Sequence, residues 1–112
     1  MPHIQVNATC PITEEQEAKL VQQIGDSISL LPGMKAEYLM IRLEPQCHLY
    51  FGGTGDCGFI EVDRFGAIPA DASQQLTAKL SEIVETVLGI SKDRTYVMYT
   101  EHPYWGCHGH NF

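Results

Sequence analysis

The hydrophobic positions first alternate and then recur at helical spacing, and this order occurs twice along the chain. In residues 2–8 every second residue is apolar, which is typical of a strand with one buried face. Pro11 ends that run, and Thr13 with Gln16 has the spacing of a capping box at the start of a helix. The helix is predicted to run to Pro32-Gly33, with apolar positions Leu20, Val21, Ile24, Ile28 and Leu31. Residues 37–43 form the next predicted strand.

The second half of the chain repeats this order. A strand is predicted near residues 59–63, Pro69 breaks it, and Asp71 is the expected cap of a second helix. The inward positions of this helix are Leu76, Leu80, Ile83, Val84 and Val87. Gly89 is expected to end the helix, and residues 95–99 form the last predicted strand.

Two strand-helix-strand units predict an α/β fold, called α+β in some schemes. Each unit supplies a parallel strand pair, and the two pairs join into one four-stranded sheet with both helices on one face. Residues 39–41 and 96–99 are apolar at successive positions, the pattern of strands buried on both faces. Since two helices cover only one face, either another copy of the chain or a long C-terminal segment must cover the other. We infer a homo-oligomer.

Composition limits the size of the fold and the kinds of partner. The chain has 112 residues, of which 44% are hydrophobic, and this fits a single domain over residues 1–112. Fourteen acidic against seven basic residues give a net charge of −7, which disfavours nucleic acid and anionic membranes as partners. No signal-peptide pattern and no apolar run of about 20 residues occurs. We therefore expect a cytoplasmic protein, and export by a route without a signal peptide stays open.

The cysteines and histidines are candidates for disulfide bonds or metal ligands. The four cysteines are Cys10, Cys47, Cys57 and Cys107. They lack a C-x-x-C motif and a secretory signal, so reduced thiols are expected. Cys107, His108 and His110 could ligate zinc or copper, but their spacing does not match the usual ligand pairs. A polar tail is the favoured interpretation, and no metal is predicted.

Residues 53–58 match the G-x-G-x-x-G pattern of dinucleotide-binding proteins. That motif works by placing pyrophosphate at the N-terminus of a helix that follows directly. Here the residues that follow are predicted to form a strand, so the pattern indicates a glycine-rich turn and no nucleotide cofactor.

The N-terminus carries the most informative chemistry. Met1 precedes Pro2, and a small second residue favours removal of the methionine. A free Pro2 would be a secondary amine, and burial would lower its pKa toward the range in which general acid–base catalysis is efficient. A Met-Pro start alone is a weak signal, because it also occurs in proteins where the proline has no catalytic role.

Several features of the chain coincide: Pro2 at the start of a strand, the doubled strand-helix-strand order, Phe51-Gly52-Gly53, Asp93-Arg94-Thr95-Tyr96-Val97, and Trp105-Gly106 ahead of Phe112. Taken together, they resemble the macrophage migration inhibitory factor branch of the tautomerase superfamily. The resemblance covers essentially the whole chain. It implies a homotrimer whose sheets surround a central axis, with pockets between neighbouring subunits and no cofactor.

The resemblance also implies an activity and a set of site residues. Pro2 would be the catalytic base that moves a proton between the α-carbon and the oxygen of a keto acid such as phenylpyruvate. Tyr96 corresponds to the pocket tyrosine contributed by the adjacent subunit, and Phe65 to the residue whose backbone N–H meets the substrate carboxylate. The aromatic walls of the pocket correspond to Tyr38, Trp105 and Phe112.

The chain departs from the family pattern at several of these positions. The family's substrate-binding lysine follows a glycine directly, whereas Met34 precedes Lys35 here. The carboxylate anchor is therefore either Lys35 or Arg64. Met98 replaces the pocket asparagine, and only Cys57 remains of the family's redox cysteine pair. These departures leave an alternative open, a signalling or interaction protein that keeps the trimer but has little activity.

Overall fold

The computed structural model describes residues 2–112, so Met1, whose removal the proline hypothesis requires, lies outside the described residues. The first unit comprises β1 (Pro2–Ala8), α1 (Glu14–Ser27), the 3₁₀ turns η1 (Ile28–Leu30) and η2 (Ala36–Tyr38), and β2 (Met40–Glu44). The second comprises β3 (Gly58–Phe65), α2 (Ala70–Leu88), η3 (Lys92–Arg94) and β4 (Thr95–His102). A short hairpin of β5 (Gly106–Cys107) and β6 (His110–Asn111) follows.

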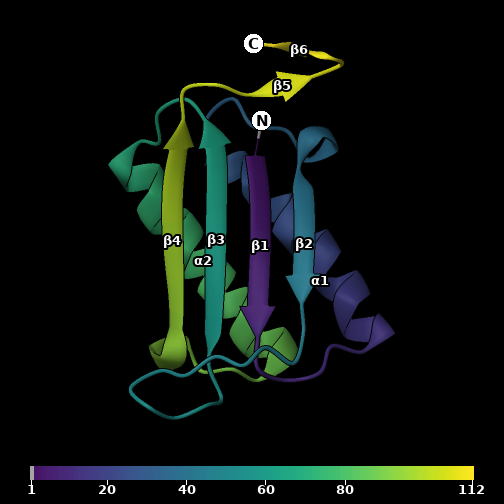
Figure 1. Ribbon diagram of the computed structural model, residues 1–112, viewed down its shortest axis with the longest axis vertical. Coiled ribbons are helices and arrows are strands. Elements are labelled where there is room, and N and C mark those ends of the chain that lie inside the picture. The colour runs from purple at the N-terminus through teal and green to yellow at the C-terminus, as the bar shows by residue number, and fades with distance from the viewer. Residues whose placement is uncertain (1) are drawn as a thin grey trace.

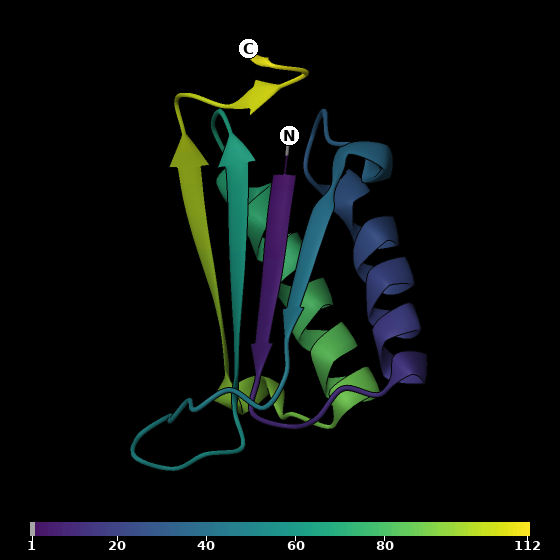
Figure 2. The same ribbon diagram turned by 45° about the vertical axis from the view of Figure 1, so that its right-hand side comes forward.

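The four long strands form one sheet in the order β2-β1-β3-β4. β1 pairs with β2 and β3 with β4 in parallel, while the central pair, β1 and β3, is antiparallel. Both helices lie against the same face of the sheet (Figures 1 and 2). The predicted fold class and topology are therefore confirmed. No helix within residues 2–112 is both long enough and apolar enough to cross a membrane.

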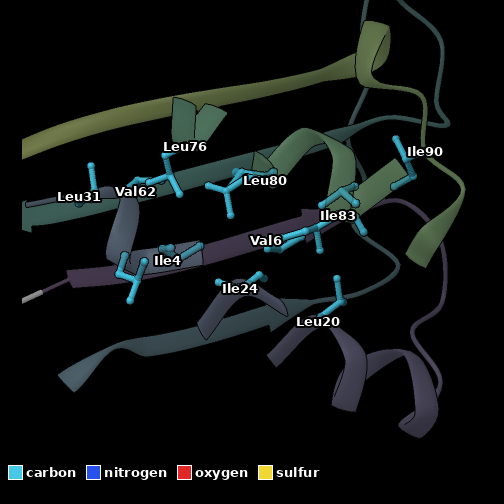
Figure 3. Packing of buried hydrophobic residues seen from close by; sticks show 14 of the residues in the cluster. Ile4, Val6, Leu20, Ile24, Leu31, Val62, Leu76, Leu80, Ile83 and Ile90 are labelled. Atoms are coloured by element: carbon cyan, nitrogen blue, oxygen red, sulfur yellow. The ribbon is translucent and has the colours of Figure 1, made fainter. Parts of the chain in front are cut away.

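The core lies between the sheet and the two helices (Figure 3). Ile4 and Val6 of β1 are buried because alternate residues of a strand point to the same face. Leu20 and Ile24 pack against them from α1, since residues four apart share one side of a helix. The matching side chains of α2 are Leu76, Leu80, Ile83 and Val84. Burial of each such side chain contributes roughly 1.5–3 kcal/mol, so this layer is the main stabilising contact of the fold.

One of the two predicted helix starts is confirmed and the other is wrong. Thr13 Oγ1 accepts a hydrogen bond from the Gln16 N–H (3.1 Å), and the Thr13 N–H donates to Gln16 Oε1 (2.9 Å), which completes the capping box. Asp71 is not a cap. α2 begins at Ala70 after Pro69, whose extended backbone sets the entry of the helix, and Asp71 lies in the first turn. Its charge there still complements the helix dipole.

Two further sequence predictions need correction. Val21 belongs to the predicted apolar stripe but is 46% exposed, because it lies about 100° around α1 from the buried Leu20. The predicted strand over 37–43 begins only at Met40, since the chain first forms the turn η2. Tyr38 therefore projects from a turn at the end of the sheet and not from a strand.

The sheet face opposite the helices is uncovered in the single chain, as the sequence predicted. Met40 is 69% and Tyr96 65% exposed, and Met98 is also exposed. The C-terminal residues do not fold beneath this face, because the β5–β6 hairpin lies beyond the end of the sheet (Figures 1 and 2). Cover by a C-terminal segment is therefore wrong as an explanation of the apolar strands.

Candidate active site

A cavity of about 500 Å³ opens at the end of the sheet where β1 begins. Its lining residues are Pro2, His3, Glu37, Tyr38, Leu39, Met40, Trp105, Gly106 and Cys107. β1 supplies one wall, the η2 segment a second, and the C-terminal hairpin a third. The fold thus brings together three residues singled out from the sequence, Pro2, Tyr38 and Trp105.

Pro2 occupies the first position of a central strand and is buried. A proline is tolerated at a strand's first residue, where its missing N–H removes no bond from the middle of the ladder. In the antiparallel register Pro2 lies opposite Arg64 of β3. Burial beside an aromatic cavity is the environment that the hypothesis of a catalytic proline requires.

Arg64 has an unusual set of partners. Its Nε donates to the Phe65 carbonyl (3.3 Å) and its Nη2 to the Pro32 carbonyl (3.2 Å). Nη1 is buried and finds no hydrogen-bond partner among residues 2–112. Buried polar groups nearly always have a partner, so an unpaired buried donor is unusual.

Lys35 is the other candidate anchor, and its setting differs. It lies on the exposed connection just before η2, where its carbonyl accepts a hydrogen bond from the Tyr38 N–H (3.2 Å). Neither Lys35 nor Arg64 is among the residues that line the cavity in the single chain. Arg64 is nevertheless tied to Pro2 through the strand register, whereas Lys35 is not.

The structure does not bring Tyr96 and Met98 to Pro2 within one chain. Tyr96 lines a second cavity of about 400 Å³ at the opposite end of the sheet, with residues that include Phe51 and Phe59. It lies opposite Phe59, which in turn lies opposite Asn7. Asn7 is five residues from Pro2 along β1, so Tyr96 lies about 16 Å from Pro2 along the sheet at a strand's rise per residue. Only another subunit could place Tyr96 at this Pro2.

Aromatic contacts join the C-terminal hairpin to the end of the sheet. The rings of Phe65 and Phe112 lie 6.0 Å apart between centroids, and those of His102 and Trp105 lie 5.5 Å apart in an edge-to-face arrangement. The Phe112 N–H also donates to the Trp105 carbonyl (3.0 Å). Phe65, Trp105 and Phe112 are thus grouped around the end of the sheet that carries Pro2.

A hydrogen-bonded cluster beside Pro2 was not predicted. His3 Nδ1 lies 3.1 Å from Asp63 Oδ2, and His102 Nε2 lies 2.7 Å from Asp63 Oδ1. Burial acts to raise the pKa of Asp63, but the hydrogen bonds and charges of His102 and His3 outweigh it and hold the pKa below its ordinary value. The cluster depends on the β1–β3 register, which the sequence pattern does not give.

The cysteine and histidine candidates show no metal site in the part of the chain described. Within residues 2–112 no group of three or more His, Cys, Asp or Glu side chains could hold a metal ion. Cys107 and His110 face each other across the hairpin, and His108 lies in its turn. The four cysteines are free thiols.

These features define the class of protein. Two β-α-β units that share one sheet, with a buried proline at the head of a central strand, make this a tautomerase-type α+β protein. Residues 1–110 match the model of the family described as Macrophage migration inhibitory factor (MIF), and the chain belongs to that family. The resemblance inferred from the sequence is confirmed.

Solved structures carry the same fold at low sequence identity. Leishmania major MIF2 has a TM-score of 0.93 at 20% identity, over 100% of this chain and 97% of that chain. The macrophage migration inhibitory factor homologue of Prochlorococcus marinus has a TM-score of 0.88 at 25% identity, over 98% of both chains. A fused 4-OT wild-type asymmetric trimer has 0.84 at 24%, over 97% of this chain and 94% of that chain. No curated protein sequence matches the chain.

Proposed function

We propose that this protein, once Met1 is removed, is a keto–enol tautomerase for aromatic 2-keto acids such as phenylpyruvate. The observation that carries the proposal is Pro2, buried at the head of β1 and lining a cavity with the aromatic residues Tyr38 and Trp105. Membership of the family supports an isomerase of the tautomerase kind. The aromatic walls fit the ring of an aryl keto acid.

In the proposed mechanism Pro2 is the base. Its free secondary amine takes a proton from the carbon next to the keto group, and the protonated amine returns a proton in the reverse direction. A desolvated cavity favours the neutral amine over its charged form. The reaction needs only proton transfer, so the proposal assigns no cofactor.

Arg64 is the proposed anchor of the substrate carboxylate. The support is its buried Nη1, which lacks a partner among residues 2–112, and its position opposite Pro2 in the register. A guanidinium that binds a carboxylate through two parallel hydrogen bonds fixes both position and orientation. Lys35, on its exposed connection, is the alternative anchor. Phe65 is assigned a backbone contact to the same carboxylate, and Phe112 an aromatic wall.

The proposed active unit is a homotrimer, in which Tyr96 and Met98 come from the neighbouring subunit. Three observations support this: the exposed apolar face of the sheet, the separation of Tyr96 from Pro2 within one chain, and the trimeric assembly of the fused 4-OT neighbour. Sedimentation analysis should give three times the 12.5 kDa mass of one chain. A monomer at assay concentration would contradict this assembly.

The test of the function separates processed from unprocessed protein. Intact-mass spectrometry identifies the Met1-free and Met1-retaining forms, and each is assayed for phenylpyruvate ketonisation. We expect turnover only from the Met1-free form, and a loss of at least about 100-fold in Pro2→Gly, the usual size of a general acid–base contribution. Pro45→Ala, at an exposed loop position, is the matched control and should be unaffected.

Equal activity of the two forms would contradict the Pro2 mechanism. The alternative left open by the sequence, a signalling or interaction protein, predicts no turnover from the Met1-free form and a Pro2→Gly variant that keeps its partner-dependent function.

A further inference from the structure

His3 lies in the same cavity as Pro2 but on the other face of the sheet. Ile4, Val6 and Ala8 point toward the helices, so their neighbour His3 points to the uncovered side. Its side chain is 25% exposed and lines the cavity mouth with Pro2 and Trp105. The imidazole and the proposed base therefore line one cavity from the two faces of the sheet.

We propose that His3 is a second catalytic acid–base residue of this site, with Asp63 and His102 as its positioning residues. This inference rests on the proposed tautomerase function. In this proposal His3 exchanges a proton with the enol oxygen of the substrate, whereas Pro2 exchanges one with the carbon.

The hydrogen bonds around Asp63 determine which nitrogen of His3 is free. An ionised carboxylate only accepts hydrogen bonds, and its oxygens lie beside His3 Nδ1 (3.1 Å) and His102 Nε2 (2.7 Å). His3 therefore carries its proton on Nδ1, which leaves the lone pair of Nε2 available to the cavity. Because each oxygen of Asp63 has its own partner, the carboxylate and the His3 ring are held in one orientation.

The cluster is also joined to the cavity wall. The ring of His102 packs edge-to-face on Trp105, which lines the cavity. Movement of the wall when an aromatic ligand binds would thus reach His3 through His102 and Asp63. This coupling distinguishes His3 from a surface histidine such as His48, which is exposed on the loop after β2.

The titratable and charged groups around His3 come from several elements. Asp63 faces it from β3 and His102 from β4, while Met40, its register partner on β2, is apolar. From the other cavity walls come Glu37 and Cys107. Arg64 lies opposite Pro2 in the register, on the other face of the sheet from His3, and donates to the carbonyls of Phe65 and Pro32. The Asp63 carboxylate beside the ring would stabilise the imidazolium formed during the reaction.

The proton transfers balance for ketonisation of an enol. Protonated Pro2 delivers its proton to the carbon, and the electron pair of the C=C bond forms the new C–H bond. The O–H electron pair becomes the second bond of the carbonyl, and the released proton goes to His3 Nε2. Pro2 ends neutral and His3 cationic, and exchange with water restores both before the next turnover.

The primary experiment compares His3→Gln with His48→Gln in Met1-free protein. We expect kcat for phenylpyruvate ketonisation to fall by about 100-fold in His3→Gln with little change in KM, since loss of a general acid or base costs about 10²–10⁴-fold. The acidic limb of the kcat–pH profile should disappear with it, because that limb reports His3 in its neutral form. His48→Gln should match the wild-type protein in kcat and in the kcat–pH profile.

Two further variants separate catalysis from structure. Asp63→Asn should lower kcat by less than His3→Gln and shift the acidic limb, since the ring keeps its nitrogen but loses the carboxylate. His3→Gly should regain activity when imidazole is added, because free imidazole can occupy the vacated space. Rescue supports the proposal even if the variant is partly unfolded, and failure of folded His3→Gly to respond overturns it.

The outcomes distinguish this inference from the proposed function. If the wild-type protein is active and Pro2-dependent but His3→Gln keeps more than a third of kcat with the same pH profile, only this inference fails. If the Met1-free wild-type protein has no turnover, the proposed function fails, and the inference fails with it.

Discussion

Two arginines at opposite ends of the sheet are used in different ways. Arg94, next to the start of β4, donates from Nε and Nη2 to the loop of residues 51–56. Its acceptors are the carbonyls of Asp56 (2.9 Å), Phe51 (3.3 Å), Thr54 (3.0 Å) and Gly55 (2.8 Å), and the Thr54 hydroxyl (2.6 Å). Arg64, near the end of β3, makes two bonds to carbonyls and keeps a buried Nη1 without a partner among the described residues.

The difference separates a cation whose hydrogen bonds hold a loop from one that keeps a buried donor unpaired among the described residues. The Arg94 guanidinium satisfies carbonyls of an irregular loop and lies over the Phe51 ring, whose centroid is 4.9 Å from that of Tyr96. It therefore holds the loop in place. A buried donor without a partner, as in Arg64, costs about 1–3 kcal/mol, which an incoming anion would offset. The cation with unfilled hydrogen-bonding capacity is the one beside Pro2.

The largest expected effect is on activity at the Arg64 end. Arg64→Gln should lower kcat/KM for phenylpyruvate by about 100-fold, since a charge-assisted pair to a carboxylate is lost. Its free energy of unfolding should change by less than about 1 kcal/mol. The gain from removing the unpartnered Nη1 offsets the loss of the two hydrogen bonds to carbonyls. Lys35→Gln is the matched comparison and should lose less than about threefold. A larger loss in Lys35→Gln than in Arg64→Gln would show that the anchor is Lys35.

Arg64→Gln mainly lowers activity in this prediction, whereas Arg94→Gln should mainly lower stability. We expect the free energy of unfolding to fall by about 2 kcal/mol, since charged hydrogen bonds to several loop carbonyls are lost while the exposed carbonyls regain water. Urea titration of the variant beside wild-type protein at one fixed concentration measures this. Arg42→Gln, which removes only a surface ion pair with Glu44 at an exposed strand position, is the control with a change near zero. A stable Arg94→Gln would mean that the loop holds without the guanidinium.

A smaller effect tests whether Arg94 acts through Thr54. The Thr54 hydroxyl donates to the Phe51 carbonyl (3.1 Å) and accepts from Arg94, so Thr54→Ala should cost about 1 kcal/mol. In the double variant with Arg94→Gln the two losses should sum to more than the measured total, because both residues support one loop. Strict additivity would argue against a shared network.

The smallest expected effect is a pH dependence at the Pro2 end. The pKa of Asp63 is lowered in the folded protein, so its contribution to stability is fully present above the unfolded pKa, about 3.9, and is lost as the pH falls through the folded pKa. Asp63→Asn should therefore lose less stability at pH 3 than at pH 7. Urea titrations of the variant and of the wild-type protein at the two pH values measure this difference.

The helices and strands were predictable because they depend on local pattern. The alternation in residues 2–8, the capping box of Thr13 and Gln16, and the stop at Gly89 each determine structure within a few residues. Gly89 has a φ of 74°, the left-handed conformation that glycine adopts without strain at a helix end. Asp71 failed as a cap because Pro69, two residues earlier, already sets the extended entry to the helix.

The site was only partly predictable, because its contacts depend on strand register. Pro2, Tyr38 and Trp105 could be singled out from the chain, but the pairing of Pro2 with Arg64 and of His3 with Asp63 joins strands about 60 residues apart. A one-residue slip would place these side chains on opposite faces. The hairpin at the C-terminus was also missed, although His108 and Gly109, both with positive φ, form the pair of residues that a tight hairpin turn prefers.

The position of the two chain ends has a practical consequence. The start of β1 and the C-terminal hairpin lie at the same end of the sheet (Figure 1), and both border the cavity. A purification tag or a fluorescent protein fused at either end would sit at the cavity mouth, and an N-terminal tag would also leave Pro2 as an amide. Reporter groups are better attached to the outer surface of the helices, for example at the exposed Lys19.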